Sequence, residues 1–430
     1  MRPSPARRPV TEPVWPLPGR ASVPAVRTPD AAGDPCAAGD LCTDVLATLR
    51  RSDQRRKGER YVHGLLHTPG RKTIRNIAAW IGEHAGEQSL HHFISSSTWD
   101  WSLLRARLAR RLEQELAPRA WVVRPMVGSQ RRATPSRVGV DRRYVPHLRQ
   151  TVNSQHSWGL WYASESGAVP VNWQLSIGDG WLGDEGLRRR AAIPRELRAR
   201  PSEAVAAGIV GETAGWGLPR KPLVMDAREL PVASLIRALS AAGQPFMLRI
   251  DNGTTLLAPG LSGAGRPVTA TCADRRAGEV PAAPGGMVDP AEPAVPRTSL
   301  LALLPVCWPG LLPVPGTVAR PGGAAGNGTR RPPARSLVLV AEWQPDRSRV
   351  VELWVTNMTD AGRGTLLRLG KFLRRVETGS AGAGHDVGLR DFEGRSYPGW
   401  HRHVTLASLA HAMWSSPPGH PAAGGRRATA

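Results

Sequence analysis

The chain has 430 residues, enough for two or three domains with a large core. Its 57 Lys and Arg against 35 Asp and Glu give a formal net charge of +22, which favours a polyanionic partner such as nucleic acid. There is no run of about 20 apolar residues and no apolar N-terminal region. We therefore expect no contact with a membrane, no signal peptide and a cytoplasmic location.

The first part of the chain divides into a leader and a helical region. Residues 1–40 are rich in Pro, Ala and Arg without periodicity, which predicts a disordered leader. Within residues 41–116 apolar side chains recur at helical spacing in stretches that begin at Leu41, Ile74 and Leu103. This pattern predicts an all-helical unit of about 75 residues.

The period then changes to that of strands. Residues rich in Val, Trp and Tyr predict four strands, with turns at Asn153 and Gly167, over residues 120–127, 137–145, 157–163 and 169–175. Helices and strands then alternate, with helices over 202–216 and 231–242 and strands over 223–226 and 246–250. Strands followed by this alternation are typical of an α/β fold with a sheet of mixed direction.

Residues 251–335 interrupt this pattern with repeated Gly, Pro and Ala, and we interpret them as an insertion, partly disordered. The core, which begins at residues 117–250, resumes at 336–414. There the pattern predicts strands over 337–343 and 350–357, helices over 365–377 and 404–414, and a Gly-rich break between those helices. A disordered tail is expected over 415–430.

Two acidic residues stand where an α/β sheet gathers its ligands. Asp226 ends an apolar strand and Glu377 ends a predicted helix. Functional groups of open α/β sheets collect at strand ends, and carboxylates from separate elements suit Mg²⁺. The alternative is structural, because an Asp after a strand is often a turn former and a Glu at a helix end is usually solvated.

Long ordered blocks of sequence are similar to the DDE-type bacterial insertion-sequence transposases. They include EQSLHHFISSSTWDW at 87–101, SRVGVDRRY at 136–144, the strand that ends in Asp226, and GLRDFEGRSYPGWHRHVTL at 388–406. The resemblance implies an RNase H-like core behind a helical DNA-binding region. It also implies DNA strand cleavage and transfer, with Mg²⁺ or Mn²⁺ as cofactor and Asp226 and Glu377 as the second and third acidic metal ligands.

The catalytic triad of this family is degenerate here. Active members resemble Trp-x-x-Asp-Asp-Thr on the first strand, whereas this chain has Arg124 and Pro125 after Trp121. An ion pair between Arg124 and Asp226 would satisfy the charges without a metal. Asp141, on the next strand, is a candidate substitute ligand, although pairing with a neighbouring Arg is the simpler role for it.

Basic groups suited to DNA phosphates are plentiful. Any one of them could be a solvated surface residue, and the His residues could pack instead. The prediction of DNA binding therefore rests on the clustering of these residues and not on any single one. The candidate DNA-binding residues are Arg56, Lys57, Arg71, Lys72, Arg75, Arg142, Arg143, Arg395, His401, Arg402 and His403.

The sequence thus predicts a transposase-like protein that binds double-stranded DNA, has no small-molecule substrate and carries an impaired cleavage site. A homodimer on DNA is expected if the joining activity persists, because the family's reaction holds two DNA ends together. The alternative is a non-catalytic DNA-binding or regulatory protein derived from a transposase.

Overall fold

A computed structural model describes residues 35–82, 86–128, 137–145, 149–258, 266–268, 300–308, 337–343 and 350–415 of the chain. The predicted leader and tail lie almost wholly outside these ranges, as does most of the predicted insertion. No helix within them is long and apolar enough to cross a membrane.

Five of the described helices precede the sheet, where the helical spacing predicts three. The Thr73 hydroxyl accepts a hydrogen bond from the backbone N–H of Asn76 at the start of the third helix, and Asp100 caps the fifth by accepting from that of Ser102. The first helix begins within the predicted leader. The five are α1 (Pro35–Leu46), α2 (Ser52–His67), α3 (Ile74–Ile81), α4 (Gly86–Ser95) and α5 (Trp101–Glu115).

A large sheet of mixed direction follows, in the order β2-β3-β1-β5-β6-β11-β10-β9, with β4 paired to β3. β1 is antiparallel to β3 but parallel to β5, and β5 is parallel to β6. Its strands are β1 (Ala120–Val127), β2 (Val140–Val145), β3 (Gln150–Ala163), β4 (Ala168–Ser176), β5 (Leu223–Asp226), β6 (Phe246–Ile250), β9 (Leu300–Val306), β10 (Leu337–Trp343) and β11 (Val350–Thr356). A separate pair consists of β7 (Leu256–Ala258) and β8 (Arg266–Val268). The predicted α/β core with a sheet of mixed direction behind a helical region is confirmed.

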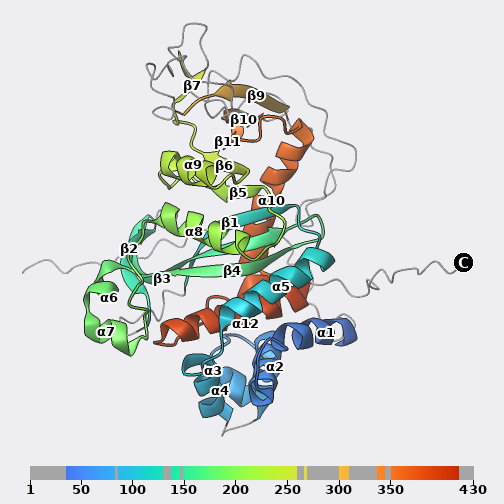
Figure 1. The fold of residues 1–430 in the computed structure, drawn as a ribbon, viewed down its shortest axis with the longest axis vertical. Helices are drawn as coiled ribbons and strands as arrows, with labels where there is room; N and C mark the ends of the chain where they lie inside the picture. Colours follow the sequence, from blue (N-terminus) through green and yellow to red (C-terminus); the bar gives the residue numbers. More distant parts are fainter. Residues whose placement is uncertain are drawn as a thin grey trace, which may run out of the picture.

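Of the helices after β4, α8, α9, α10 and α12 pack against strands of this sheet (Figure 1). α10 packs against β1 and β5, and the almost entirely buried α12 packs against β4 and against α2, α4 and α5. α12 therefore joins the N-terminal helices to the sheet. The helices are α6 (Asp179–Gly183), α7 (Glu185–Arg190), α8 (Ser202–Ala214), α9 (Val232–Ala241), α10 (Arg363–Ala381), α11 (Ala383–Asp386) and α12 (Tyr397–Ser415).

Three details of the sequence prediction were wrong. The predicted insertion supplies β9, whose apolar residues pair with those of β10, so it contributes a strand to the main sheet. Asn153 lies inside β3 rather than in a turn, because β3 extends to pair with β2. α10 continues through Gly379 to Ala381, into the predicted Gly-rich break, with Gly382 at its C-cap.

Candidate functional site

The two predicted acidic ligands lie in neighbouring elements. Asp226 is the last residue of β5, and Glu377 lies in the last turns of α10, which packs against β5. Burial raises the pKa of the Glu377 carboxyl, Arg124 and Arg249 oppose that rise, and Asp226 adds to it. The two carboxylates are therefore close enough to interact.

Arg124 lies beside this pair. Val123 of β1 is opposite Met225 of β5, so one further step of the parallel register places Arg124 next to Asp226. The Arg124 side chain does not pair with Asp226, which corrects the predicted ion pair. Its Nη1 donates instead to the backbone carbonyls of Val376 (3.2 Å) and Glu377 (3.4 Å) and to the Ser380 hydroxyl. Arg124 thus ties β1 to the end of α10.

Asp226 forms ion pairs with two other guanidinium groups, those of Arg228 and Arg249. Arg228 donates to it through two nitrogens, with Nη2 2.6 Å from Oδ2 and Nε 2.9 Å from Oδ1. Arg249 Nη1 lies 3.8 Å from the same Oδ2. Bidentate pairs of this kind are among the stronger charge-assisted contacts. A cation at Asp226 would have to compete with both side chains.

An ion network continues from Asp226 across the sheet. Arg249 Nη2 lies 2.9 Å from Oε1 of Glu352, and Arg374 Nη2 lies 3.0 Å from Oε2 of Glu342 and 3.3 Å from Oε2 of Glu352. Glu342 and Glu352 face each other in the β10–β11 register, and both are buried. These residues were not predicted from the sequence. Their signal was a charged side chain inside an apolar strand, which requires a buried partner.

The residues present do not fit a pair of divalent cations. Two-metal phosphodiester chemistry needs several converging carboxylates. Within the described part of the chain, no group of three or more His, Cys, Asp or Glu side chains converges. Asp226 is held by Arg228 and Arg249, and Arg124 lies next to both candidate ligands. Since a guanidinium stays charged at every physiological pH, these groups repel a cation.

Asp141 does not complete the site. It pairs with Arg143 (3.3 Å) and lies against Gly178, just before α6. β2 is three strand positions from β5 in the sheet order, about 14 Å at the usual spacing between strands. This is the simpler role that the sequence analysis gave as the alternative.

A profile of the DDE superfamily endonucleases matches residues 44–299, more than half of the chain. The chain belongs to the DDE endonuclease superfamily. The matched region contains Arg124 and Asp226 and ends before α10, which carries Glu377.

Among solved structures, the chain is similar to the piggyBac transposase in its synaptic complex with hairpin DNA. The identity is 8% and the TM-score 0.40, over 90% of this chain and 76% of that one. No curated protein matches the chain.

The candidate DNA-binding residues of this DDE superfamily chain divide by exposure. Arg56, Arg75, Arg142 and Arg395 are exposed, and Lys57, Arg71 and Arg143 are partly exposed. The four others are buried, which corrects the prediction that they reach DNA: Lys72, His401, Arg402 and His403.

The three buried members on α12, which are His401, Arg402 and His403, hold this helix in place instead. His401 Nδ1 lies 3.0 Å from Nη2 of Arg105, and His403 Nδ1 lies 2.8 Å from the Tyr61 hydroxyl. Arg402 lies over the rings of Trp99 and Trp101. The alternating His residues of the sequence block are therefore packing residues.

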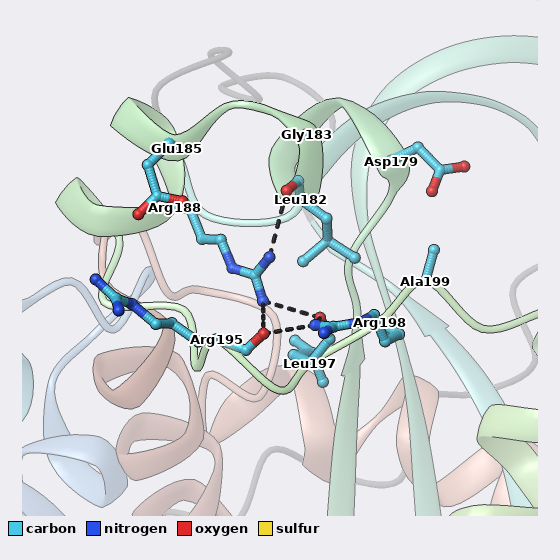
Figure 2. Close-up of a pocket in the computed structure, with 9 residues that line it drawn as sticks. All are labelled: Asp179, Leu182, Gly183, Glu185, Arg188, Arg195, Leu197, Arg198 and Ala199. Carbon is cyan, nitrogen blue, oxygen red and sulfur yellow. Dashed lines mark hydrogen bonds between the residues drawn. The ribbon is translucent and has the colours of Figure 1, made fainter.

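An open pocket of about 700 Å³ lies apart from the acidic site, next to α6 and α7. Figure 2 shows Arg188 at its centre, donating to the carbonyls of Leu182, Arg195 and Leu197. The nearby Arg198 also donates to the Arg195 carbonyl. These guanidinium groups donate to backbone oxygens of the loop that lines the pocket. Their role here is therefore to hold the loop in place.

Proposed function

We propose that this chain is a DNA-binding protein derived from a bacterial insertion-sequence transposase, acting in the cytoplasm on double-stranded DNA. Its ancestral metal-dependent strand cleavage and transfer is impaired. Asp226 and Glu377 are the surviving acidic positions, and Arg124 stands where the first carboxylate of the family belongs. Membership of the superfamily supports the ancestral activity.

The observation that carries this proposal is the set of contacts around Arg124. Its guanidinium binds the backbone carbonyl of Glu377 and the Ser380 hydroxyl, so a fixed positive charge lies between β1 and the end of α10. In an active site that cleaves DNA with two metal ions, a metal-binding carboxylate would take the place of Arg124. Asp226 meanwhile is neutralised by Arg228 and Arg249. The arrangement supports a metal-independent fold in which the carboxylates have become partners of arginines.

The binding function draws on the basic surface. We assign it to the helical region 41–116 together with exposed arginines of the core. Such contacts are made mainly to phosphates and give affinity without sequence readout. Binding releases counterions, so the affinity should fall steeply as salt rises. A dimer that holds two DNA ends together is needed only for the joining reaction, and binding alone does not require one.

Fluorescence anisotropy with a labelled duplex tests the binding proposal. The wild-type chain, Asp226→Ala and Glu377→Ala should bind with equal affinity in EDTA and in Mg²⁺, and the affinity should fall with salt. Arg56→Ala combined with Arg75→Ala should weaken binding and reduce the slope of log affinity against log salt by roughly two. Binding that requires Mg²⁺ and is lost in Asp226→Ala would overturn the proposal in favour of a working metal site.

A further inference from the structure

Three aromatic rings stack on the surface of the N-terminal helices. His63 and His67 lie one turn apart on α2, with ring centroids 4.4 Å from each other. Trp80 of α3 lies 5.2 Å from the His63 ring and 5.7 Å from the His67 ring, and its plane is within 18° of that of His67. We call these three residues the ring stack.

The ring stack is open to solvent. Both histidines are exposed, and 41% of Trp80 is exposed, which is unusual for a large apolar side chain among the described residues. His67 is exposed but partly shielded from water, and this desolvation lowers the pKa of its ring; the neighbouring His63 and Lys72 lower the pKa further, so the ring is neutral at neutral pH. Trp80 and His67 therefore present an uncharged aromatic surface.

Positive charge surrounds the ring stack. Arg60 and Arg56 lie three and seven residues before His63, on the same exposed face of α2. Between Arg50 and Arg75 the chain carries nine Lys or Arg against two Asp or Glu. These helices lie at the end of the molecule opposite β7 and β9 (Figure 1). A polyanion that also offers a flat aromatic face matches this surface in both charge and shape.

We propose that the ring stack binds an unpaired nucleobase of DNA whose phosphates follow the basic face of α2. This inference rests on the proposed function, because it takes DNA as the partner and adds that unpaired bases are preferred. A base in an intact duplex hides both faces in its stack, whereas an unpaired base can stack on an exposed Trp. Stacking of this kind tolerates any base, because each has a π face.

The test compares two labelled DNAs in EDTA, which prevents a metal from bridging the two histidines. One is a blunt duplex, and the other is the same duplex with a short unpaired purine overhang. The wild-type chain should bind the overhang DNA roughly tenfold more tightly. Trp80→Ala should remove this preference and leave the affinity for the blunt duplex unchanged, and Trp80→Phe should keep much of it.

A matched control is Trp414→Ala, because Trp414 of α12 is 37% exposed and belongs to no ring stack. That variant should bind both DNAs as the wild type does. The inference is overturned if the wild type shows no preference, if Trp80→Ala keeps it, or if Trp80→Ala weakens both DNAs equally. If the wild type binds neither DNA, the proposed function fails as well, and this outcome differs from the other three.

Discussion

Replacing Arg124 by Asp restores a carboxylate to the first strand and removes the guanidinium that ties β1 to α10. In EDTA the variant loses the hydrogen bonds to Val376 O, Glu377 O and the Ser380 hydroxyl. A charged donor contributes about 1.5–3 kcal/mol per hydrogen bond at best, and these bonds share one partly buried group. The new carboxylate also lies beside those of Asp226 and Glu377, and the like charges repel one another. We therefore expect a loss of about 3 kcal/mol in the free energy of unfolding.

Divalent metal should reverse part of this loss in the variant alone. With three carboxylates and no Arg124, the site gains the ligand type that Mg²⁺ and Mn²⁺ prefer. A metal that binds only the folded chain stabilises it by about 2.7 kcal/mol at a concentration one hundred times its Kd. Arg228 and Arg249 still compete for Asp226, so a high Mn²⁺ concentration is required.

The assay is urea unfolding of the wild type and Arg124→Asp, each in EDTA and in Mn²⁺. We expect the variant to be less stable in EDTA and to recover in Mn²⁺, with no Mn²⁺ effect on the wild type. Arg124→Met is the matched control, since it removes the guanidinium without adding a ligand and should not respond to Mn²⁺. The reasoning is refuted if Mn²⁺ stabilises the wild type, or if Arg124→Asp is as stable as the wild type in EDTA.

Two further predictions concern buried charges. Arg249→Met leaves the buried Glu352 with Arg374 as its ion-pair partner, so the free energy of unfolding should fall by about 3 kcal/mol in urea titrations; an unchanged midpoint would contradict a structural role for the network. Burial lowers the pKa of His411 from 6.5 to about 4. The unfolded chain therefore takes up the proton first, and stability should fall by about 3 kcal/mol as the pH drops from about 6.5 to about 4. His411→Gln should reduce the slope of this profile but not abolish it, because burial also lowers the pKa of His401 and His403. An unchanged slope would mean that His411 is not buried in its neutral form.

Most strands could be predicted from the sequence because their apolar runs are short and bounded by turns. The strands that end in Asp226 and Trp343 match the predicted bounds, since each is largely buried and mostly apolar. Helices α2 and α4 were missed. α2 carries six charged residues from Asp53 to Arg60, which obscure its apolar face.

The candidate site was predictable only in part. Asp226 and Glu377 stand out as acidic residues at element ends, but the partner of a charged side chain depends on packing that the sequence does not specify. Arg124 therefore reaches the carbonyls of α10 instead of Asp226. For the same reason the burial of His401 and His403 could not be foreseen, because α12 is enclosed by helices distant in sequence.

The most direct test of the proposed impairment is nicking of supercoiled DNA by the wild-type chain in Mg²⁺ and in Mn²⁺, beside Asp226→Ala and Glu377→Ala. The account predicts that all three proteins bind the DNA and that none nicks it above the level without protein. Nicking by the wild type that disappears in both variants would contradict the account, because it would mean that Asp226 and Glu377 still hold a working metal beside Arg124.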